Sequence, residues 1–187
     1  MADGGLAVLG GAGEVVEADE TYIGRKKGSE RKRGGAGHKN AVVSLVQRGG
    51  KVRSFHVDRA DKATVAGIVM QHVHGDSRLH TDESHLYRGA EAVVAQHERV
   101  FHAAKEYARG DVTTNSVEGF FSIFKRGMKG VYQHCDEKHL HRYLSEYDFR
   151  YNNRVALGVG DETRAVIALK GVAGKRLTYQ TVGAARG

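Results

Sequence analysis

The segment V-V-E-A-D-E-T-Y-I, Val15 to Ile23, combines β-branched residues with three acids. Its composition is typical of a β-strand, and Asp19 stands out as an acid inside an otherwise apolar run. Because side chains alternate between the two faces of a strand, Glu17 and Asp19 share one face and Glu20 lies on the other. This periodicity does not choose between Glu17 and Asp19 as a functional acid.

Beyond this strand, apolar periodicity and glycine punctuation predict a mixed series of strands and helices. Gly49-Gly50 favours a hairpin turn between two of the strands. The expected elements are strands at 41–47 and 52–57, a helix at 61–73, a strand at 78–81, a helix at 86–95, a strand at 99–103 and long helices at 114–129 and 138–152. This order predicts an α/β fold with a mixed sheet flanked by helices.

Length, charge and cysteine content indicate the kind of protein and the kind of partner. The 187 residues suit one domain, and 29 Lys and Arg against 22 Asp and Glu give a net charge of +7. Such a surplus favours a polyanionic partner, with nucleic acid ahead of an anionic membrane, although a merely basic surface would look the same. One cysteine excludes an internal disulfide and a C-x-x-C zinc site. Without a long apolar run or a signal peptide, we expect a cytoplasmic protein that does not enter the membrane.

Three acids from separate segments are candidates for phosphodiester chemistry. Such chemistry uses two divalent cations held by converging carboxylates, and Mg²⁺ prefers oxygen ligands. Asp19 lies in the first strand, Asp82 follows the strand at 78–81, and Glu118 lies in the first turns of the helix at 114–129. The alternative for Asp82 is a turn or capping residue before Ser84.

The helix at 114–129 has two distinct faces. Its apolar stripe comprises Val117, Phe120, Phe121, Phe124 and Met128, and its polar face comprises Asn115, Glu118, Ser122, Lys125 and Lys129. Seven residues are nearly two helical turns, so Glu118 and Lys125 point the same way. We therefore predict a metal ligand at one end of this face and phosphate-binding cations farther along, with Arg126 beside them. An ordinary solvated face is the alternative.

The segment from Arg25 to Lys39 is rich in glycine and positive charge, with seven Lys and Arg against one Glu. We expect a loop that neutralises DNA phosphates without reading sequence, giving affinity that falls steeply with salt. The candidate contacts in it are Arg31, Lys32, Arg33 and Lys39. A solvated charge run is the alternative.

Several segments, in order, resemble the catalytic domain of DDE-type insertion-sequence transposases over roughly residues 14–182. The motifs that carry the resemblance are E-A-D-E-T-Y-I-G (17–24), H-T-D-E-S-x-x-Y (80–87), T-N-S-V-E-G-F-F-S-I-F-K-R-G-M-K-G-V-Y (114–132) and F-R-Y-N-N-R (149–154). The 35 residues between Asp82 and Glu118 match the separation typical of DDE enzymes. The closest subgroup shares the D-E-T-Y-I-G, K-R-G-x-x-G-x-Y and R-Y-N-x-R patterns.

This resemblance implies an RNase H-like fold and DNA strand cleavage followed by strand transfer, dependent on two Mg²⁺ or Mn²⁺ ions. It assigns the catalytic and metal-binding triad to Asp19, Asp82 and Glu118, and so chooses Asp19 over Glu17. It implies double-stranded DNA, both transposon ends and target, as the partner of a nucleoid-associated homo-oligomer. Some related enzymes carry Asn as the last ligand, but an ionised carboxylate holds a divalent ion better than an amide, so we assign Glu118 to that role. Asn115 would then orient the DNA substrate or supply a secondary ligand.

The sequence also differs from the usual members of this group in two respects. Members of the group usually have an N-terminal zinc-ribbon or helix-turn-helix region, which this sequence lacks before Asp19, and Arg25 stands where a second glycine is common. We expect a disordered leader at residues 1–13, the catalytic domain at 14–155 and a C-terminal tail at 156–187. The competing hypotheses are a truncated remnant that binds DNA without catalysis and an RNase H-like nuclease without strand transfer.

Overall fold

The computed structural model describes residues 7–30, 36–101, 108–133 and 135–174. The chain forms two compact units, residues 1–152 and 153–187. The first unit contains the sheet, the helices packed on it and every candidate site residue that the structure describes. The predicted domain boundaries at residues 13 and 155 stay predictions.

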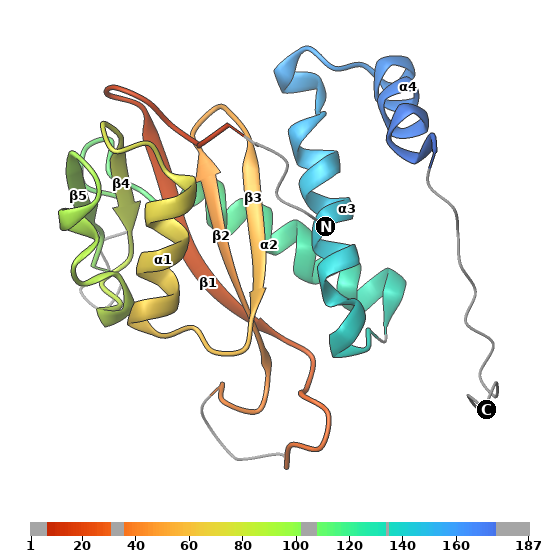
Figure 1. The fold of residues 1–187 in the computed structure, drawn as a ribbon, viewed down its shortest axis with the longest axis horizontal. Helices are drawn as coiled ribbons and strands as arrows, with labels where there is room; N and C mark the ends of the chain where they lie inside the picture. The colour runs from red at the N-terminus through yellow and green to blue at the C-terminus, as the bar shows by residue number, and fades with distance from the viewer. Residues whose placement is uncertain (1–6, 31–35, 102–107, 134, 175–187) are drawn as a thin grey trace. The chain divides into compact units, whose positions relative to one another are not determined.

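A five-stranded mixed sheet forms the centre of the first unit (Figure 1). The strands are β1 (Val15–Ile23), β2 (Asn40–Gln47), β3 (Val52–Val57), β4 (Arg78–Thr81) and β5 (Gln96–Arg99). Their order across the sheet is β3-β2-β1-β4-β5. The hairpin partners β2 and β3 run antiparallel to their neighbours, whereas β1, β4 and β5 run parallel to one another. The predicted α/β class is confirmed, and the arrangement is consistent with an RNase H-like domain.

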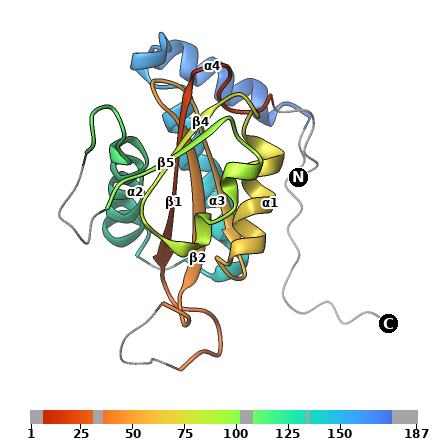
Figure 2. The same cartoon turned by 90° about the vertical axis from the view of Figure 1, so that its left-hand side faces the viewer.

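Helices cover both faces of this sheet, with α1 (Lys62–His72) and α2 (Asn115–Gly127) on opposite sides (Figure 2). Under α1, apolar residues of β1 and β2 pack with the helix: Val16, Ala18, Val43, Leu45, Val65 and Val69. On the other face, β2 and β3 pack with α2 and α3 (Leu140–Asn152) through Val42, Val46, Val52, Phe120, Phe124 and Leu144. The alternation predicted for the strands therefore sends one set of side chains to each core.

Helix α3 is tied to the edge strand β3 by polar side chains as well as by packing. Asp148 accepts hydrogen bonds from the backbone N–H of Ser54 at 2.8 Å and from its hydroxyl at 2.7 Å. Asn152 bonds the backbone of Val52 in both directions, at 2.6 and 2.9 Å. These bonds satisfy backbone groups of β3 that have no further strand beside them.

The helix predicted at 86–95 is wrong. The structure has two single 3₁₀ turns there, His85–Tyr87 and Ala90–Ala92. Between them Gly89 has φ of 95°, a left-handed conformation that stops a right-handed helix. The next strand also begins earlier than predicted, at Gln96 rather than residue 99. Residues 102 and 103 of that predicted strand lie outside the described residues.

Helix α2 ends earlier than residue 129, because its regular part stops at Gly127 and a π-helical turn, Met128–Tyr132, follows. At Gly127 the helix meets Tyr147 of α3 so closely that an added Cβ would lie 1.5 Å from the Tyr147 hydroxyl oxygen. A larger residue at this position would therefore force Tyr147 or the helices to shift. The predicted helix at 138–152 is confirmed as α3, preceded by a 3₁₀ turn at Glu137–His139.

The structure also describes parts of the predicted leader and of the predicted C-terminal tail. Leu9, within the predicted leader, is buried, and its backbone N–H donates to the His72 carbonyl at 2.8 Å. In the second unit, a 3₁₀ turn (Val155–Leu157) precedes α4 (Asp161–Val172). Within this unit Arg164 bonds the Asn153 carbonyl at 2.7 Å and the Asp161 carboxylate at 2.7 Å.

Candidate active site

The parallel pairing of β1 with β4 brings two candidate acids to the same level of the sheet. The register joins Val15 to Arg78, then one pair per residue up to Glu17 with His80. Asp19 and Asp82 each stand two residues beyond that last pair, with Asp82 just past the end of β4. The pairing itself ends at Glu17 and His80, and the charge of Asp82 still acts on the Asp19 carboxyl beyond that point.

Asp19 is surrounded by other acids. Burial raises the pKa of its carboxyl, and the negative charges of Glu20, Asp82 and Glu118 raise it further, to about 8. One hydrogen bond opposes this shift, since the backbone N–H of Glu20 donates to Asp19 Oδ1 at 2.8 Å. The three sequence-predicted acids, from β1, the end of β4 and α2, are therefore near enough to interact electrostatically.

Glu118 lies exposed in the first turns of α2. The hydroxyl of Thr114, the residue before the helix, donates to Glu118 Oε1 at 2.6 Å and orients the carboxylate. Asn115 is the first residue of α2 and is also exposed. Asp82 forms a tight turn, because its Oδ1 accepts from the Ser84 N–H at 2.9 Å. The turn alternative for Asp82 is thus present in the structure together with its proximity to Asp19.

Glu17, on the same face of β1 as Asp19, has a different environment. It is fully buried, and its carboxylate accepts five hydrogen bonds from Arg48, Ser116 and Val117. Both of its oxygens are thus engaged by protein donors. Periodicity left open which of the two acids is functional, but their surroundings differ. Glu17 holds elements together, whereas Asp19 lies near other acids.

Comparison with protein families gives an independent result for the same chain. The sequence pattern of the ISXO2-like transposase domain matches residues 9–152. The chain belongs to this family. Transposition is therefore the function that the family indicates for this domain, and DNA is the partner. The finer motif subgroup stays a prediction, and a comparison with curated proteins found no match.

Carboxylates of the transposase domain are the side chains that could hold the two expected cations. Among residues 7–30, 36–101, 108–133 and 135–174, no three His, Cys, Asp or Glu side chains form a ready-made metal site. The donor chemistry nevertheless fits Mg²⁺ or Mn²⁺, because carboxylate oxygens are their preferred ligands. The raised pKa of Asp19 fits as well, since a bound cation would offset the negative charges of Glu20, Asp82 and Glu118 that raise it.

A fourth acid and a tyrosine belong to this part of the transposase domain, and the sequence analysis did not select them. Burial and the charge of Asp82 raise the pKa of Glu20. The buried Tyr87 donates its hydroxyl hydrogen to Glu20 Oε2 at 3.1 Å. Both residues lie within the quoted motifs, but strand alternation placed Glu20 on the face opposite Asp19. Only the packing of the 3₁₀ turn at 85–87 against β1 reveals the contact.

The candidate DNA contacts are spread over α2 and the basic loop. Lys125 is half-buried, with its ammonium 5.9 Å from the centre of the Phe121 ring. Arg126, Lys129 and Lys39 are exposed. Within the described part of the loop, Lys26 donates to the Asp58 carbonyl. Three predicted contacts, Arg31, Lys32 and Arg33, lie outside the described residues.

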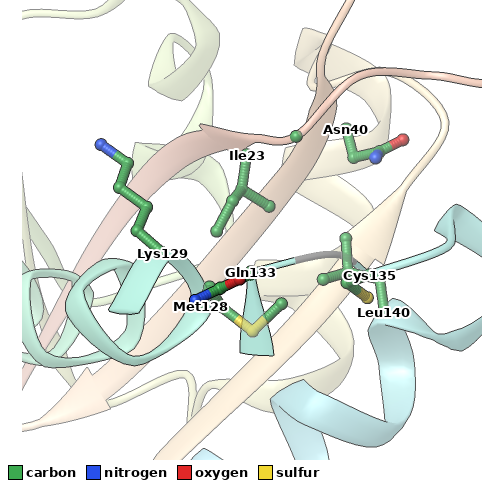
Figure 3. A pocket seen from close by; sticks show the side chains of 8 residues that line it. Ile23, Asn40, Met128, Lys129, Gln133, Cys135 and Leu140 are labelled. Atoms are coloured by element: carbon green, nitrogen blue, oxygen red, sulfur yellow. The ribbon is translucent and has the colours of Figure 1, made fainter. Parts of the chain in front are cut away.

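A hollow of about 240 Å³ lies where the basic loop joins the sheet (Figure 3). Its lining comprises Ile23, Gly24, Asn40, Met128, Lys129, Gln133, Cys135 and Leu140. Gly24 and Asn40 precede and follow the loop, and Lys129 comes from the π-helical turn after α2. The hollow thus lies between two of the segments predicted to contact DNA phosphates.

The described part of the transposase domain contains no helix that is both long and apolar enough to cross a membrane.

Proposed function

We propose that this chain is the catalytic core of a DDE transposase, which cleaves a DNA strand at a transposon end and then transfers it to target DNA. The observation that carries the proposal is the electrostatic coupling of Asp19 to Asp82 and Glu118. Three acids from separate elements repel one another around this half-buried position, and such crowding is typical of functional sites where a bound cation offsets the repulsion.

Asp19, Asp82 and Glu118 would hold two Mg²⁺ or Mn²⁺ ions. When bound, such a pair of cations supplies electrostatic stabilisation to the attacking and leaving oxygens of an in-line phosphodiester displacement. The chain's own part is to hold the carboxylates in place: β1 and β4 fix Asp19 and Asp82, and Thr114 orients Glu118. Asp19 would give up its proton on ion binding, since a ligating carboxylate must be ionised.

DNA would be held by cations that flank these acids. On α2, Lys125 and Arg126 would contact phosphates, as would Lys129 in the π-helical turn that follows, and Asn115 would orient the strand near Glu118. In the basic loop, the contacts would be Arg31, Lys32, Arg33 and Lys39. Such contacts position the duplex without selecting its sequence. Assembly of a homo-oligomer on the paired transposon ends is part of the same proposal.

The direct test is a cleavage and joining assay with Mn²⁺ and oligonucleotides that carry the inverted repeats flanking the coding sequence. We expect nicking at the repeat end, followed by joining to target DNA, and loss of both in Asp82→Asn. The matched control is Asp76→Asn, which changes an exposed acid in the turn before β4. Cleavage that persists in Asp82→Asn would contradict the proposal.

A second candidate is a DNA-binding protein without catalysis. It is favoured by the lack of a ready-made metal site among the described residues, together with the net charge of +7. The same assay separates the candidates. Salt-sensitive DNA binding without Mn²⁺-dependent cleavage would support the second, and cleavage without joining would indicate a nuclease of RNase H-like fold.

A further inference from the structure

The buried carboxylate of Glu17 joins β1 to the start of α2. Its Oε2 accepts from the backbone N–H groups of Ser116 and Val117, at 2.7 and 3.1 Å. Its Oε1 accepts from the Ser116 hydroxyl at 2.9 Å and from two nitrogens of Arg48, at 2.7 and 3.0 Å. Glu17 has no exposed surface, so its carboxylate depends on these protein donors rather than on water.

The first backbone N–H groups of a helix have no partner within the helix. In most helices the residue before the first turn accepts from them, but Thr114 makes no such side-chain bond. Its hydroxyl donates to Glu118 instead. Glu17 therefore takes over the capping role from a distant strand, and the favourable interaction of a carboxylate with the helix dipole adds to it.

Arg48 fixes the segment that leads into the same helix. Beyond its ion pair with Glu17, its guanidinium donates to the Asp111 carbonyl at 2.8 Å. It also donates to the Thr113 hydroxyl at 3.1 Å and the Thr113 carbonyl at 3.3 Å. The lead-in to α2 and its first turn are thus attached to one ion pair, in which Glu17 of β1 is buried and Arg48, the residue after β2, is about a third exposed.

We propose that Glu17, paired with Arg48, is a positioning residue that sets where Glu118 lies relative to Asp19. Glu17 is two residues from Asp19 on one face of β1, and its acceptor bond to Val117 ends one residue before Glu118. The anchor therefore fixes the spacing of the two acids. Its role in ion binding rests on the proposed function, whereas its role in holding α2 does not.

Replacing Glu17 with glutamine removes the negative charge and one acceptor oxygen but keeps the size of the side chain. The amide keeps one acceptor oxygen, so it can serve either the N–H groups of α2 or the guanidinium of Arg48. Its NH₂ group would face donors on the other side, which leaves buried polar groups unpaired. We expect the first turn of α2 to open more often, and Glu118 to be held less firmly near Asp19.

The experiment compares the full chain with E17Q, E118Q and the double variant. Hydrogen–deuterium exchange of the peptide around Ser116 and Val117 should be at least about 10-fold faster in E17Q. Mn²⁺ titration followed by the electron paramagnetic resonance of the free ion should show a roughly 10- to 100-fold loss of affinity in E17Q, as for other residues that orient metal ligands. In the E118Q background, E17Q should cost no more than about 2-fold, since a residue that acts through Glu118 has no further effect once Glu118 is gone.

The matched control is D148N, which also removes a buried carboxylate that accepts a backbone N–H, but at the α3–β3 contact. It should lower thermal stability without changing the affinity for Mn²⁺. Equal losses of affinity from E17Q in the wild-type and E118Q backgrounds would overturn the proposal, and so would unchanged exchange at Ser116 and Val117. If wild-type protein bound no Mn²⁺ while E17Q still exchanged faster, the proposed function would fail and the anchor would stand.

Discussion

At the scale of single residues, β1 gives two neighbouring acids opposite surroundings. Glu17 is fully buried among five hydrogen-bond donors, whereas Asp19 accepts one backbone hydrogen bond and lies near three other acids. A carboxylate saturated by donors is a structural group, and one crowded by like charges is destabilised as an anion unless a proton or a cation neutralises it. This difference makes Asp19 the acid suited to ion binding.

The stability of the ion-free protein should depend on pH through Asp19. Its pKa is about 8 in the folded chain against 3.8 ordinarily, so its contribution is fully present below pH 3.8 and is lost as pH rises through 8. Asp19→Asn should therefore melt roughly 3–8 °C above wild type at pH 9 and close to it at pH 4. Thermal melts in a chelating buffer measure this, with Asp76→Asn as the exposed control. A difference that does not vary with pH would contradict the account.

Lys125 should contribute one phosphate contact. Lys125→Ala should weaken binding to every duplex by a similar factor and reduce the slope of log affinity against log salt by about one unit. Fluorescence anisotropy at several salt concentrations measures both quantities. Arg142→Ala, which removes one exposed charge from α3, should leave the slope unchanged. Equal effects of the two substitutions would show that only total charge matters.

At this scale, the sequence predicted some residues of the candidate site and missed others. Asp19, Asp82 and Glu118 were selected by their context and by family resemblance, and the structure places them within electrostatic reach of one another. Glu20 and Tyr87 were missed, because their contact joins residues 67 positions apart across elements whose packing no local pattern reveals. The ion pair of Glu17 with Arg48 was missed for the same reason.

At the scale of elements, α2 carries both the packing and the proposed chemistry. Its buried side comprises Val117, Phe120, Phe121 and Phe124, while Glu118 and Lys125 lie on the side that the sequence predicts to be polar. The amphipathic spacing that predicted this helix is a strong local signal. The short apolar run at 86–95 carried a weaker one, and Gly89 with its positive φ divides that run into two turns.

The close contact between α2 and α3 gives a prediction for Gly127. Gly127→Ala would place a methyl group 1.5 Å from the Tyr147 hydroxyl oxygen, so the helices must separate or Tyr147 must move. We expect a loss of about 1–3 kcal/mol in the free energy of unfolding, measured by urea denaturation.

Gly119→Ala is the control within the same helix, because an added methyl group there meets no atom within 4 Å. It should raise the free energy of unfolding by about 0.5–1 kcal/mol, since alanine favours helix over glycine. A neutral or stabilising effect of Gly127→Ala would show that the α2–α3 contact is looser than described.

At the scale of the whole molecule, the order of strands decides what meets. The parallel neighbours β1 and β4 are separated by two strands and a helix in sequence, yet their pairing up to Glu17 and His80 brings Asp82 near enough to act on the Asp19 carboxyl. Element order alone predicted the α/β class, but it could not give this pairing, because several sheet orders satisfy the same series of strands and helices. The family resemblance supplied what the pattern could not.

The overall charge of +7 should be visible in DNA binding. If about six phosphates are neutralised, affinity should fall roughly 10³-fold between 50 and 200 mM salt, because binding releases counterions from the duplex. Anisotropy titrations with unrelated duplexes measure this, and similar values are expected for all of them. Affinity that hardly changes with salt would exclude phosphate contacts as the main source of binding.

The central claim is that Asp19, Asp82 and Glu118 form one cation site, and anomalous diffraction from crystals grown with Mn²⁺ tests it most directly. The account predicts two anomalous peaks about 3.5–4 Å apart that contact these three carboxylates. Peaks bound elsewhere, or none at saturating Mn²⁺, would contradict it.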